Sequence, residues 1–531
     1  MELNAEQLQA VNSSSDRILC LAGAGAGKTR VLIERIAHQV ESGISPESIL
    51  VLTFTNAAAA EMKSRYEAKH IGNSTPEFRT FHAFCYSLLC KDVTIRSALG
   101  YTTVPAIATE EQEKNIKERA RTQCNITLSK EKLDSREHLT KQEQYQADLF
   151  DKAVNRLMHL EDIITFDKLS ADVAALFVAD HIATHPYKTQ YTYIYCDEFQ
   201  DTDDTQIRFL NSFTKSNFFF TGDTLQNIYA WRGTSNEFIK ILSNAPDWEK
   251  IMLHTNYRST RAVCEYANKF SLTYADSSYR IEMQGTRDGD KVITKLVDGP
   301  KGYAAIDSKD IADVLKENSK LSGTSAILCR TNKEVAAVTS YLKREGVPFT
   351  TSNDTKLPKL LECALSATYM MEYLASYLSS DKYGEYIRIS ALVDNPDLSW
   401  FLANYGNNSQ IKEDVRQINF LKDVANDVGT TADKITEVSK FFHIKNIKSP
   451  DKPYYGVEFL KYLLDAVLEI KETELYVGTI HSVKGLEYDN VFVMNVGSYS
   501  FRLRNEEMKN LFYVAITRAK NRLFVYELFD T

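Results

Sequence analysis

Apolar residues in the first part of the chain follow two kinds of pattern. Short continuous apolar runs predict buried strands, and apolar residues at helical spacing predict amphipathic helices. The expected strands are Ile18–Leu21, Ile49–Thr53, Tyr193–Cys196, Phe218–Thr221 and Ile251–Leu253. The expected helices are Thr29–Glu41, Ala57–Lys69 and Thr80–Leu89. Strands that alternate with helices indicate an α/β fold, in which helices cover both faces of a parallel sheet.

This alternation is interrupted between about residues 91 and 190, and a second alternation begins near residue 292. The interrupting stretch predicts charged amphipathic helices and no clear strand, at Glu110–Thr122, Ser135–Leu160 and Phe166–Asp180. The second series has an expected helix at Asn332–Glu345 and strands at Val292–Val297, Ser325–Leu328, Pro348–Thr350, Val477–Thr479, Val491–Asn495 and Leu523–Glu527. A mostly helical stretch, residues 357–469, separates the third of these strands from the fourth.

We therefore expect two α/β domains, each interrupted by a helical insertion. The first domain takes residues 1–90 and 191–275, with the insertion at 91–190. The second takes residues 276–356 and 470–531, with the insertion at 357–469. Two domains also agree with the length of 531 residues, which is too long for one compact core.

Composition narrows the class of protein. No apolar run approaches the ~20 residues of a membrane span, and the N-terminal MELNAEQLQA lacks the features of a secretory signal. The eight cysteines are scattered without a Cys-x-x-Cys pair, which is typical of reduced thiols in a cytoplasmic protein. We expect no membrane association. The net charge of −8 does not indicate nucleic-acid binding, so any such site would be a local groove.

The stretch Ala22–Thr29, AGAGAGKT, lies between the first strand and the first helix. This context predicts a phosphate-binding loop, although the strictest form of the pattern has glycine where this chain has Ala22. Its three glycines let backbone N–H groups curl around a polyphosphate at a helix N-terminus, which carries partial positive charge. Lys28 would reach the β- and γ-phosphates, and the Thr29 hydroxyl would hold Mg²⁺.

A second candidate site follows the strand Tyr193–Cys196, which ends in two adjacent carboxylates. In an open α/β sheet, ligands bind at the carboxyl ends of the strands. Asp197 would therefore hold Mg²⁺, directly or through water. Glu198 would orient or deprotonate the water that attacks the γ-phosphate.

Together with the loop Ala22–Thr29, the run Asp197–Asp201, DEFQD, resembles the UvrD/Rep/PcrA type of superfamily 1 DNA helicases. Further matches follow in that family's order: Leu3-Asn4 with Gln7, Phe54–Asn56, Thr80–His82, Thr165–Asp167, Gly222–Gly233, Asn256–Ser259, Thr479–Ser482, Lys484–Glu487 and Tyr513–Ala519. The resemblance implies two RecA-like P-loop domains. It also implies an ATP-dependent single-stranded DNA translocase and helicase that uses Mg²⁺ and moves 3′-to-5′. Its partner would be single-stranded DNA or a single-strand/duplex junction.

The resemblance also implies roles around the nucleotide. Gln7 would read the adenine with its amide, Tyr257 would stack on that base, and Glu487 would contact the nucleotide from the second domain. Gln226 would report the γ-phosphate to the DNA side. The loop contacts would come from Ala22, Gly23, Ala24, Gly25, Ala26, Gly27, Lys28, Thr29 and Arg30. Arg258 and Arg518 lie far apart in sequence, and two guanidiniums that converge on the γ-phosphate would stabilise the transition state.

Aromatic residues after predicted strand ends are candidates for DNA binding. Bases stack on aromatic faces at ~1–3 kcal/mol each with little sequence preference. Trp231, between Tyr229 and Arg232, favours this interpretation, whereas core packing remains open for Phe54 and Tyr229. The other candidates for contacts with the strand are Thr55, Asn56, Thr80, His82, Arg232 and His481.

Two alternatives remain open at this point. The chain could be a DNA-stimulated ATPase switch subunit of a nuclease or defence complex, with little unwinding of its own. A nuclease or a replication or repair protein is the expected protein partner. It could also be a non-helicase P-loop enzyme such as a kinase, against which the ordered motifs argue. The insertions look shorter than in large family members, which favours translocation over processive unwinding. Thr224, Leu225 and Asn227 are unusual within their motif but replace no expected catalytic group.

Overall fold

In the computed structural model, the chain folds into two compact units. Unit 1 is Met1–Phe81, His185–Thr355 and Glu472–Thr531, and unit 2 is His82–Thr184 and Lys356–Lys471. The residues that the structure describes are 2–69, 71, 74–108, 110–135, 139–230, 234, 236–277, 279–297, 306–351, 420–421, 424–425, 430–442, 453–454, 458–463 and 475–528.

Unit 1 contains two parallel sheets, of which the first has six strands in the order β3-β2-β6-β7-β1-β8. These strands are β1 (Arg17–Ala22), β2 (Ile49–Thr53), β3 (Glu77–Thr80), β6 (Tyr193–Cys196), β7 (Asn217–Gly222) and β8 (Glu249–Leu253). β1 lies between β7 and β8, with Cys20 opposite both Thr221 and Ile251. The loops after β1, β6 and β7 therefore meet at one edge of the sheet, as expected for a ligand site.

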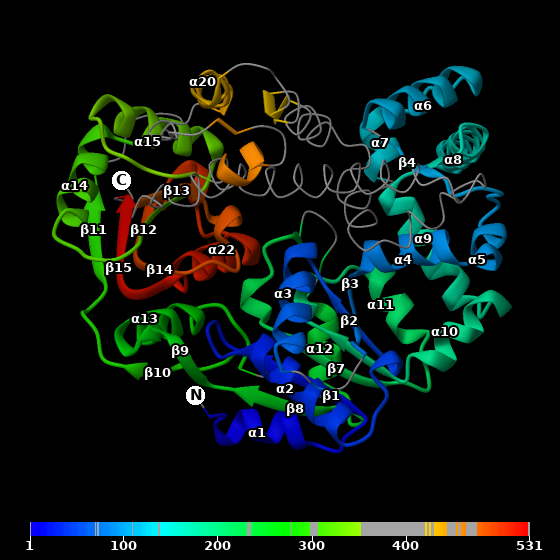
Figure 1. Ribbon diagram of the computed structural model, residues 1–531, viewed down its shortest axis with the longest axis horizontal. Coiled ribbons are helices and arrows are strands. Elements are labelled where there is room, and N and C mark those ends of the chain that lie inside the picture. The colour runs from blue at the N-terminus through cyan, green and yellow to red at the C-terminus, as the bar shows by residue number, and fades with distance from the viewer. Residues whose placement is uncertain are drawn as a thin grey trace. The chain divides into compact units, whose positions relative to one another are not determined.

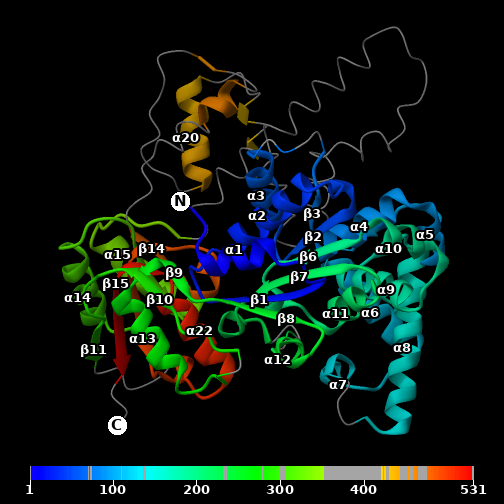
Figure 2. The ribbon, with the colours of Figure 1, turned by 90° about the horizontal axis from the view of Figure 1, so that it is seen from below.

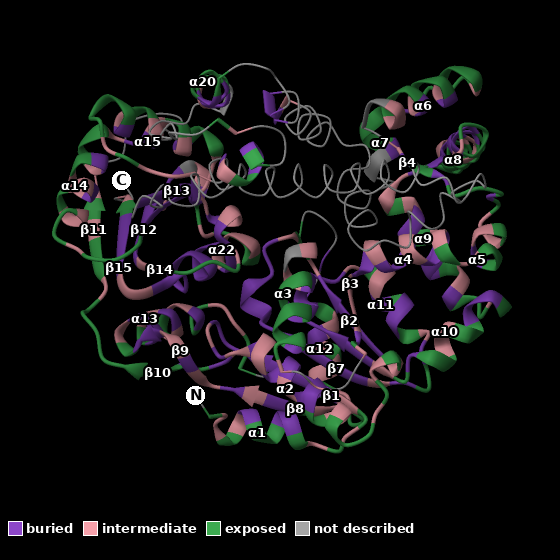
Figure 3. Ribbon diagram, viewed as in Figure 1, coloured by how far each residue is buried: buried purple, intermediate pink, exposed green. Residues whose placement is uncertain are grey.

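Helices cover both faces of the first sheet. They are α1 (Ala5–Asn12), α2 (Lys28–Glu41), α3 (Asn56–Glu67), α10 (His185–Gln190), α11 (Asp204–Asn211) and α12 (Glu237–Asn244). The helix α4 (Phe81–Lys91) belongs to unit 2 except for its first residue. Short 3₁₀ turns are η1 (Pro46–Ser48), η3 (Phe199–Asp201) and η4 (Thr224–Gln226). Figure 2 shows α2 and α3 on one face of the sheet, and α11 and α12 on the other. All of β2 and all but the first residue of β1 are buried (Figure 3), as continuous apolar strands require.

The second sheet has five parallel strands in the order β11-β15-β14-β12-β13. They are β11 (Ile293–Val297), β12 (Ser325–Cys329), β13 (Leu475–Thr479), β14 (Tyr488–Val496) and β15 (Ala519–Leu528). Figure 1 shows β11 beside the C-terminal β15, although more than two hundred residues separate them along the chain. The associated elements are α13 (Arg261–Ser271), α14 (Ser308–Asn318), α15 (Asn332–Arg344), α22 (Glu506–Ile516), η6 (Ile480–Val483) and η7 (Tyr499–Phe501).

A small third pairing leads from the first sheet to the second. β9 (Thr255–Thr260) pairs in parallel with β10 (Gln284–Arg287). One apolar core contains residues of α13, α22, β12, β14 and β15, and it also includes Ala24, Leu225 and Ile228 from the loops of the first sheet. Apolar packing in unit 1 thus continues from one sheet to the other. α13 shares its core with the second sheet.

Unit 2 is mainly helical in the part that the structure describes. Its elements there are α5 (Val93–Ala98), β4 (Ala106–Ile107), α6 (Glu110–Gln123), α7 (Lys130–Ser135), α8 (Lys141–Leu160), β5 (Ile163–Ile164), α9 (Phe166–Val178), η2 (Ile182–Thr184) and α20 (Thr431–Phe442). α6 and α8 bury one shared apolar cluster around Ile116, Phe150 and Leu157. A search of the described residues finds no helix that is long and apolar enough to cross a membrane.

Most boundaries lie within two residues of the expected ones, and the differences have local causes. β3 was not expected because Glu77-Phe78-Arg79-Thr80 is short and mostly polar, as an edge strand can be. The helix expected at Ser135–Leu160 is α8, which begins only at Lys141, because Thr140 caps it in a capping box with Glu143. Pro348–Thr350 contributes only an isolated bridge from Thr350 to Tyr476. Most of residues 357–469 lie outside the described part of the chain.

Candidate nucleotide and DNA site

The loop Ala22–Thr29 runs from the end of β1 into the first turn of α2. Gly25 and Gly27 have φ of +70° and +82°, which residues with a Cβ rarely adopt. Lys28 begins α2 and is 9% exposed, and the next residue, Thr29, lies in the same first turn. The local sequence therefore forms the strand, glycine-rich turn and helix N-terminus that a phosphate-binding loop requires.

Three residues outside the loop hold its backbone. The amide Nε2 of Gln7 donates to the carbonyl of Ala26 at 3.0 Å, and its Oε1 accepts from the backbone of Asn4. The buried Asn256 on β9 donates its Nδ2 to the carbonyl of Ala24 at 2.7 Å. The backbone N–H of Tyr257 donates to the carbonyl of Gly25 at 3.0 Å. The loop is thus fixed by α1 and β9 as well as by its own turns.

The two carboxylates after β6 lie beside this loop. Thr29 Oγ1 donates to Asp197 Oδ2 at 3.2 Å, and the hydroxyl of Thr221 on β7 donates to the other oxygen, Oδ1. Glu198 has φ of +53°, in the left-handed region that non-glycine residues seldom occupy. Gln200 Nε2 holds the Glu198 carboxylate at 2.7 Å. Such a strained conformation is typical of functional sites.

Burial and neighbouring charges shift the pKa values of Asp197 and Glu198 in opposite directions. Burial, and then the neighbouring Glu198, raise the pKa of Asp197 above its ordinary value. Burial also acts to raise the pKa of Glu198, but the charges of Lys28 and Lys484 outweigh it and hold that pKa below its ordinary value. Glu198 is therefore ionised at neutral pH, as a general base that takes a proton from water must be.

Arg258 lies on β9 next to the loop. Its Cβ is the nearest atom to the position that a Cβ on Gly25 would occupy, at 2.6 Å. Its Nε donates to Glu487 Oε2 at 2.6 Å, and its Nη1 donates to the carbonyl of Thr517 at 3.3 Å. The predicted nucleotide ligands Arg258, on β9, and Glu487, directly before β14, are thus paired with each other.

Arg518, two residues after the end of α22, is 1% exposed. Its Nη2 donates to Gln226 Oε1 at 3.1 Å, and its Nε donates to the carbonyl of Val514 at 3.0 Å. Gln226 in turn donates its Nε2 to Asp223 at 2.8 Å. Burial, and then the charge of Arg258, lower the pKa of Arg518 to about 9. The guanidinium therefore remains charged at neutral pH and lies with Gln226 at the same edge of the first sheet.

The aromatic candidates for DNA binding come together after β2, β7 and β13. The rings of Phe54 and Tyr229 stack with centroids 5.0 Å apart and an interplanar angle of 20°. The His481 ring lies 6.5 Å from Tyr229, and the ammonium of Lys484 lies 4.7 Å from the Tyr229 centroid. Trp231 and Arg232 lie outside the described residues.

The remaining candidates occupy the neighbouring strand ends. Thr55 begins α3, where its hydroxyl accepts from the N–H of Ala58. Thr80 Oγ1 donates to Asn56 Oδ1 at 3.3 Å, so these two predicted DNA contacts adjoin each other. His82, in unit 2, packs edge-on against Phe166 at 5.8 Å.

Comparison with known proteins then decides the family. The model of the UvrD/REP helicase N-terminal domain matches residues 3–247, and that of the UvrD-like helicase C-terminal domain matches residues 251–376 and 399–528. The chain belongs to the UvrD/REP helicase family. The "Probable DNA helicase II homolog" of Mycoplasma capricolum is 26% identical, over 98% of this chain and 84% of that protein. The "ATP-dependent DNA helicase PcrA" of Staphylococcus epidermidis is 25% identical, over 98% and 83%.

In this UvrD-type helicase, the unusual Asn227 has a structural explanation. Its Nδ2 donates to the carbonyl of Gln200 at 2.9 Å, and its Oδ1 accepts from Thr234 at 2.9 Å. Asn510 on α22 donates to the carbonyl of Asn227 at 3.0 Å. These amides tie the turn that carries Gln226 to the helix that precedes Arg518. Sequence reasoning matched Asn256 as part of a family motif but gave it no role, and it missed Asn510, because no local pattern distinguishes a buried amide that caps a distant carbonyl.

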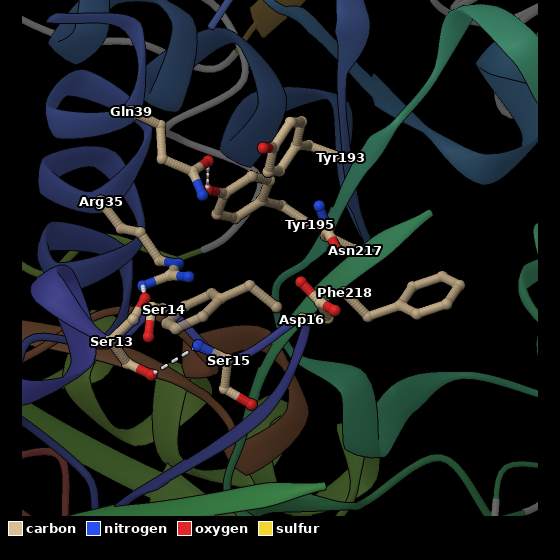
Figure 4. A pocket seen from close by; sticks show the side chains of 11 residues that line it. Ser13, Ser14, Ser15, Asp16, Arg35, Gln39, Tyr193, Tyr195, Asn217 and Phe218 are labelled. Atoms are coloured by element: carbon tan, nitrogen blue, oxygen red, sulfur yellow. Dashed lines mark hydrogen bonds between the residues drawn. The ribbon is translucent and has the colours of Figure 1, made fainter. Parts of the chain in front are cut away.

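A small cavity of about 150 Å³ lies elsewhere in the helicase, at the amino ends of β1, β6 and β7. Figure 4 shows Arg35, Gln39 and Tyr195 around it. Arg35 Nη1 donates to the carbonyls of Ala10, Val11 and Ser13 at 2.9–3.1 Å. The cavity therefore belongs to the packing of α1 on α2, at the opposite end of the strands from the phosphate-binding loop.

Proposed function

We propose that this chain, an ATP-dependent DNA helicase, moves 3′-to-5′ along single-stranded DNA and separates strands by hydrolysing Mg-ATP between two RecA-like domains. One observation carries the proposal. Two guanidiniums lie at the edge of the first sheet that carries Lys28 and Glu198: that of Arg258 on β9, whose Cβ lies beside Gly25, and that of Arg518, two residues after the second sheet's helix α22. A phosphate group at this edge would be surrounded by positive charge from both sheets.

The nucleotide would lie on the loop Ala22–Thr29. Lys28 would bind the β- and γ-phosphates. Gln7 and Tyr257, which bond to the loop's backbone, would read the adenine and stack on it. Glu198, ionised and held by Gln200, would orient the attacking water and accept its proton.

Mg²⁺ is the cation that these residues fit. Mg²⁺ binds through one or two carboxylates together with phosphate oxygens and water, so it needs few protein ligands. The hydroxyl of Thr29 and the carboxylate of Asp197, 3.2 Å apart, supply such hard oxygen donors. Within the described residues there is no group of three or more His, Cys, Asp or Glu side chains that could hold a metal. When bound, the ion would neutralise phosphate charge.

We further propose that the two sheets define the two RecA-like domains, each with a mainly helical insertion. α13 shares its core with the second sheet, which favours a border between the domains before that helix. The two family models likewise meet between residues 247 and 251. Movement of the two domains apart would separate Arg518 from Gln226, and their closure would restore the contact. The presence of ATP or ADP would thereby determine how tightly each domain binds the DNA strand.

Single-stranded DNA would pass over the cluster of Phe54, Tyr229 and His481, with Trp231 and Arg232 next to it in sequence. Stacked aromatics bind every base, as a translocase requires. The strand or a single-strand/duplex junction would be the main partner. Roles in DNA repair or replication, with a nuclease or other protein partner, fit the family.

Polarity is tested with three duplexes that carry a 3′ single-stranded tail, a 5′ tail or no tail. Strand separation is measured with ATP and Mg²⁺ in excess. The proposal predicts that the 3′-tailed duplex is opened fastest and that separation stops with a non-hydrolysable ATP analogue. Faster opening of the 5′-tailed duplex would contradict the direction.

A further inference from the structure

Lys484 is a charged residue that none of the predicted roles uses. It follows η6 on the second sheet, and its side chain is only 11% exposed. Its ammonium pairs with Asp201 Oδ2 at 2.5 Å and donates to the carbonyl of Gln226 at 2.9 Å, both on the first sheet's loops. A buried ammonium requires such partners, because desolvation otherwise opposes its charge.

Asp201 lies on the same short turn as Glu198. Its backbone N–H donates to the carbonyl of Glu198 at 2.9 Å, which closes the turn η3. Its side chain is 1% exposed, and Oδ1 has no hydrogen-bond partner among the described residues. Lys484 is therefore the charged partner of the Asp201 carboxylate. Because Asp201 ends the turn η3 and Glu198 precedes it, this ion pair also holds the turn in place.

Lys484 also contacts the aromatic residues that are candidates for binding single-stranded DNA. Its ammonium lies 4.7 Å from the centroid of Tyr229, and Phe54 stacks on the same ring at 5.0 Å. A base that stacks on Tyr229 would bind to a ring that the Lys484 ammonium and Phe54 already contact. Binding of a strand therefore changes what surrounds the ammonium or its neighbour.

We propose that Lys484 is a positioning residue that transmits strand binding at Tyr229 to Glu198 through the Asp201 ion pair, so that DNA accelerates ATP hydrolysis. This inference rests on the proposed function, since it concerns the DNA-stimulated reaction. Lys484 does not touch the reacting atoms in this scheme. It couples two sites, and such coupling typically changes a binding equilibrium by about 5- to 150-fold.

The test measures kcat and KM for ATP at saturating single-stranded DNA, and the DNA concentration that gives half-maximal rate. The full-length wild type is compared with Lys484→Gln, Lys484→Arg, Asp201→Asn and the double variant Asp201→Asn/Lys484→Gln. Lys295→Gln is the matched control, because Lys295 forms an ion pair with Asp313 within the second sheet's own elements. Thermal unfolding of each variant is recorded alongside.

We expect Lys484→Gln and Asp201→Asn each to lower kcat with DNA by about tenfold or more, while KM and the half-maximal DNA concentration stay within about twofold. The double variant should lose no more than the worse single variant, since both break one pair. Lys484→Arg should recover most of kcat, and Lys295→Gln should behave as wild type.

Three results would overturn the inference. Full kcat in Lys484→Gln at saturating DNA, with only a higher half-maximal DNA concentration, would make Lys484 a strand-binding residue alone. Additive losses in the double variant would mean that the pair does not act as a unit. Equal losses of kcat in Lys484→Gln and Lys295→Gln would point to general destabilisation. A wild type that DNA does not stimulate would overturn the proposed function as well, which distinguishes the two failures.

Discussion

The Nη2 of Arg518 donates to the Oε1 of Gln226 at 3.1 Å, and this bond joins a residue just after α22 to the turn after β7. The two residues are 292 positions apart in sequence and both are almost fully buried. Gln226 also bonds to Asp223, so a change at the phosphate edge of the first sheet reaches the second sheet through two hydrogen bonds. The same edge carries Glu198, which makes this contact the centre of the proposed chemistry.

Replacement of Arg518 by lysine should lower kcat for ATP hydrolysis by about 10³-fold or more, because a lysine keeps the charge but loses the planar fork. The acceptors Gln226, Val514 and Leu486 are arranged around three different nitrogens of the guanidinium. Steady-state ATPase assays measure the effect. Arg522→Lys is the control, since Arg522 is an exposed ion-pair partner of Asp290. Comparable rates in the two variants would count against a catalytic arginine at 518.

Replacement of Glu198 by glutamine should leave nucleotide binding intact and abolish turnover. The amide keeps the size of the side chain but cannot accept a proton from water, and loss of a general base costs about 10²–10⁴-fold in rate. Binding is measured with a fluorescent ATP analogue, and turnover with phosphate release. If the variant binds nucleotide poorly instead, Glu198 holds the substrate rather than activates the water.

Two glycines with nearly equal φ angles allow the cost of backbone strain to be measured separately from the cost of a steric contact at the loop. Gly25 and Gly346 have φ of +70° and +68°, but a Cβ on Gly25 would lie 2.6 Å from Arg258 Cβ, whereas one on Gly346 meets nothing within 4 Å. Gly346→Ala should therefore cost about 1–2 kcal/mol of unfolding free energy from the left-handed conformation alone.

Gly25→Ala should cost more than Gly346→Ala and should also abolish ATP binding, because either the loop or β9 must move. Denaturant unfolding and nucleotide titration of the two variants give the comparison. Equal unfolding free energies, with ATP binding retained, would show that the loop does not need the close approach of Arg258.

His481 gives a prediction for pH dependence. Burial, with the charges of Arg330 and Lys484, lowers the pKa of His481 to about 4, whereas a histidine in the unfolded chain titrates near 6.5. As pH falls below about 6.5, the unfolded chain takes up a proton that the folded chain does not. Stability should therefore be unaffected by His481 above pH 7 and should decrease as pH falls from 6.5 towards 4.

Urea unfolding of the wild type and of His481→Gln at pH 7.5 and pH 5 tests this prediction. The glutamine variant should lose less stability on acidification than the wild type does. Parallel losses in the two proteins would mean that His481 titrates normally. A neutral His481 at pH 7 would also contact DNA through hydrogen bonds or stacking rather than as a cation.

Features encoded by adjacent residues were predictable from the sequence. The loop Ala22–Thr29 carries its own turn chemistry, so strand, loop and helix could be placed to within two residues. Asp197 and Glu198 end an apolar strand, which places them at the ligand edge of a sheet. Family matches along the chain were confirmed by models that span both halves.

Contacts between distant segments could not be read in the same way. Lys484 meets Asp201 across 283 positions, and Asn256 holds the carbonyl of Ala24 across 232. Such pairs depend on how elements far apart in sequence pack together. The sequence around one residue of a pair does not indicate which residue is its partner. The roles of individual site residues, including Trp231 and Arg232, stay predictions.

The central claim, that ATP hydrolysis at the Lys28 loop is coupled to single-stranded DNA, is tested most directly by one measurement. Steady-state ATPase is recorded with and without single-stranded DNA, for the wild type, for Lys28→Ala, and for Lys316→Ala as an exposed-lysine control. We predict strong stimulation by DNA in the wild type and the Lys316 variant, and no turnover in a folded Lys28→Ala protein. A rate that DNA does not change, or normal turnover in Lys28→Ala, would contradict the account.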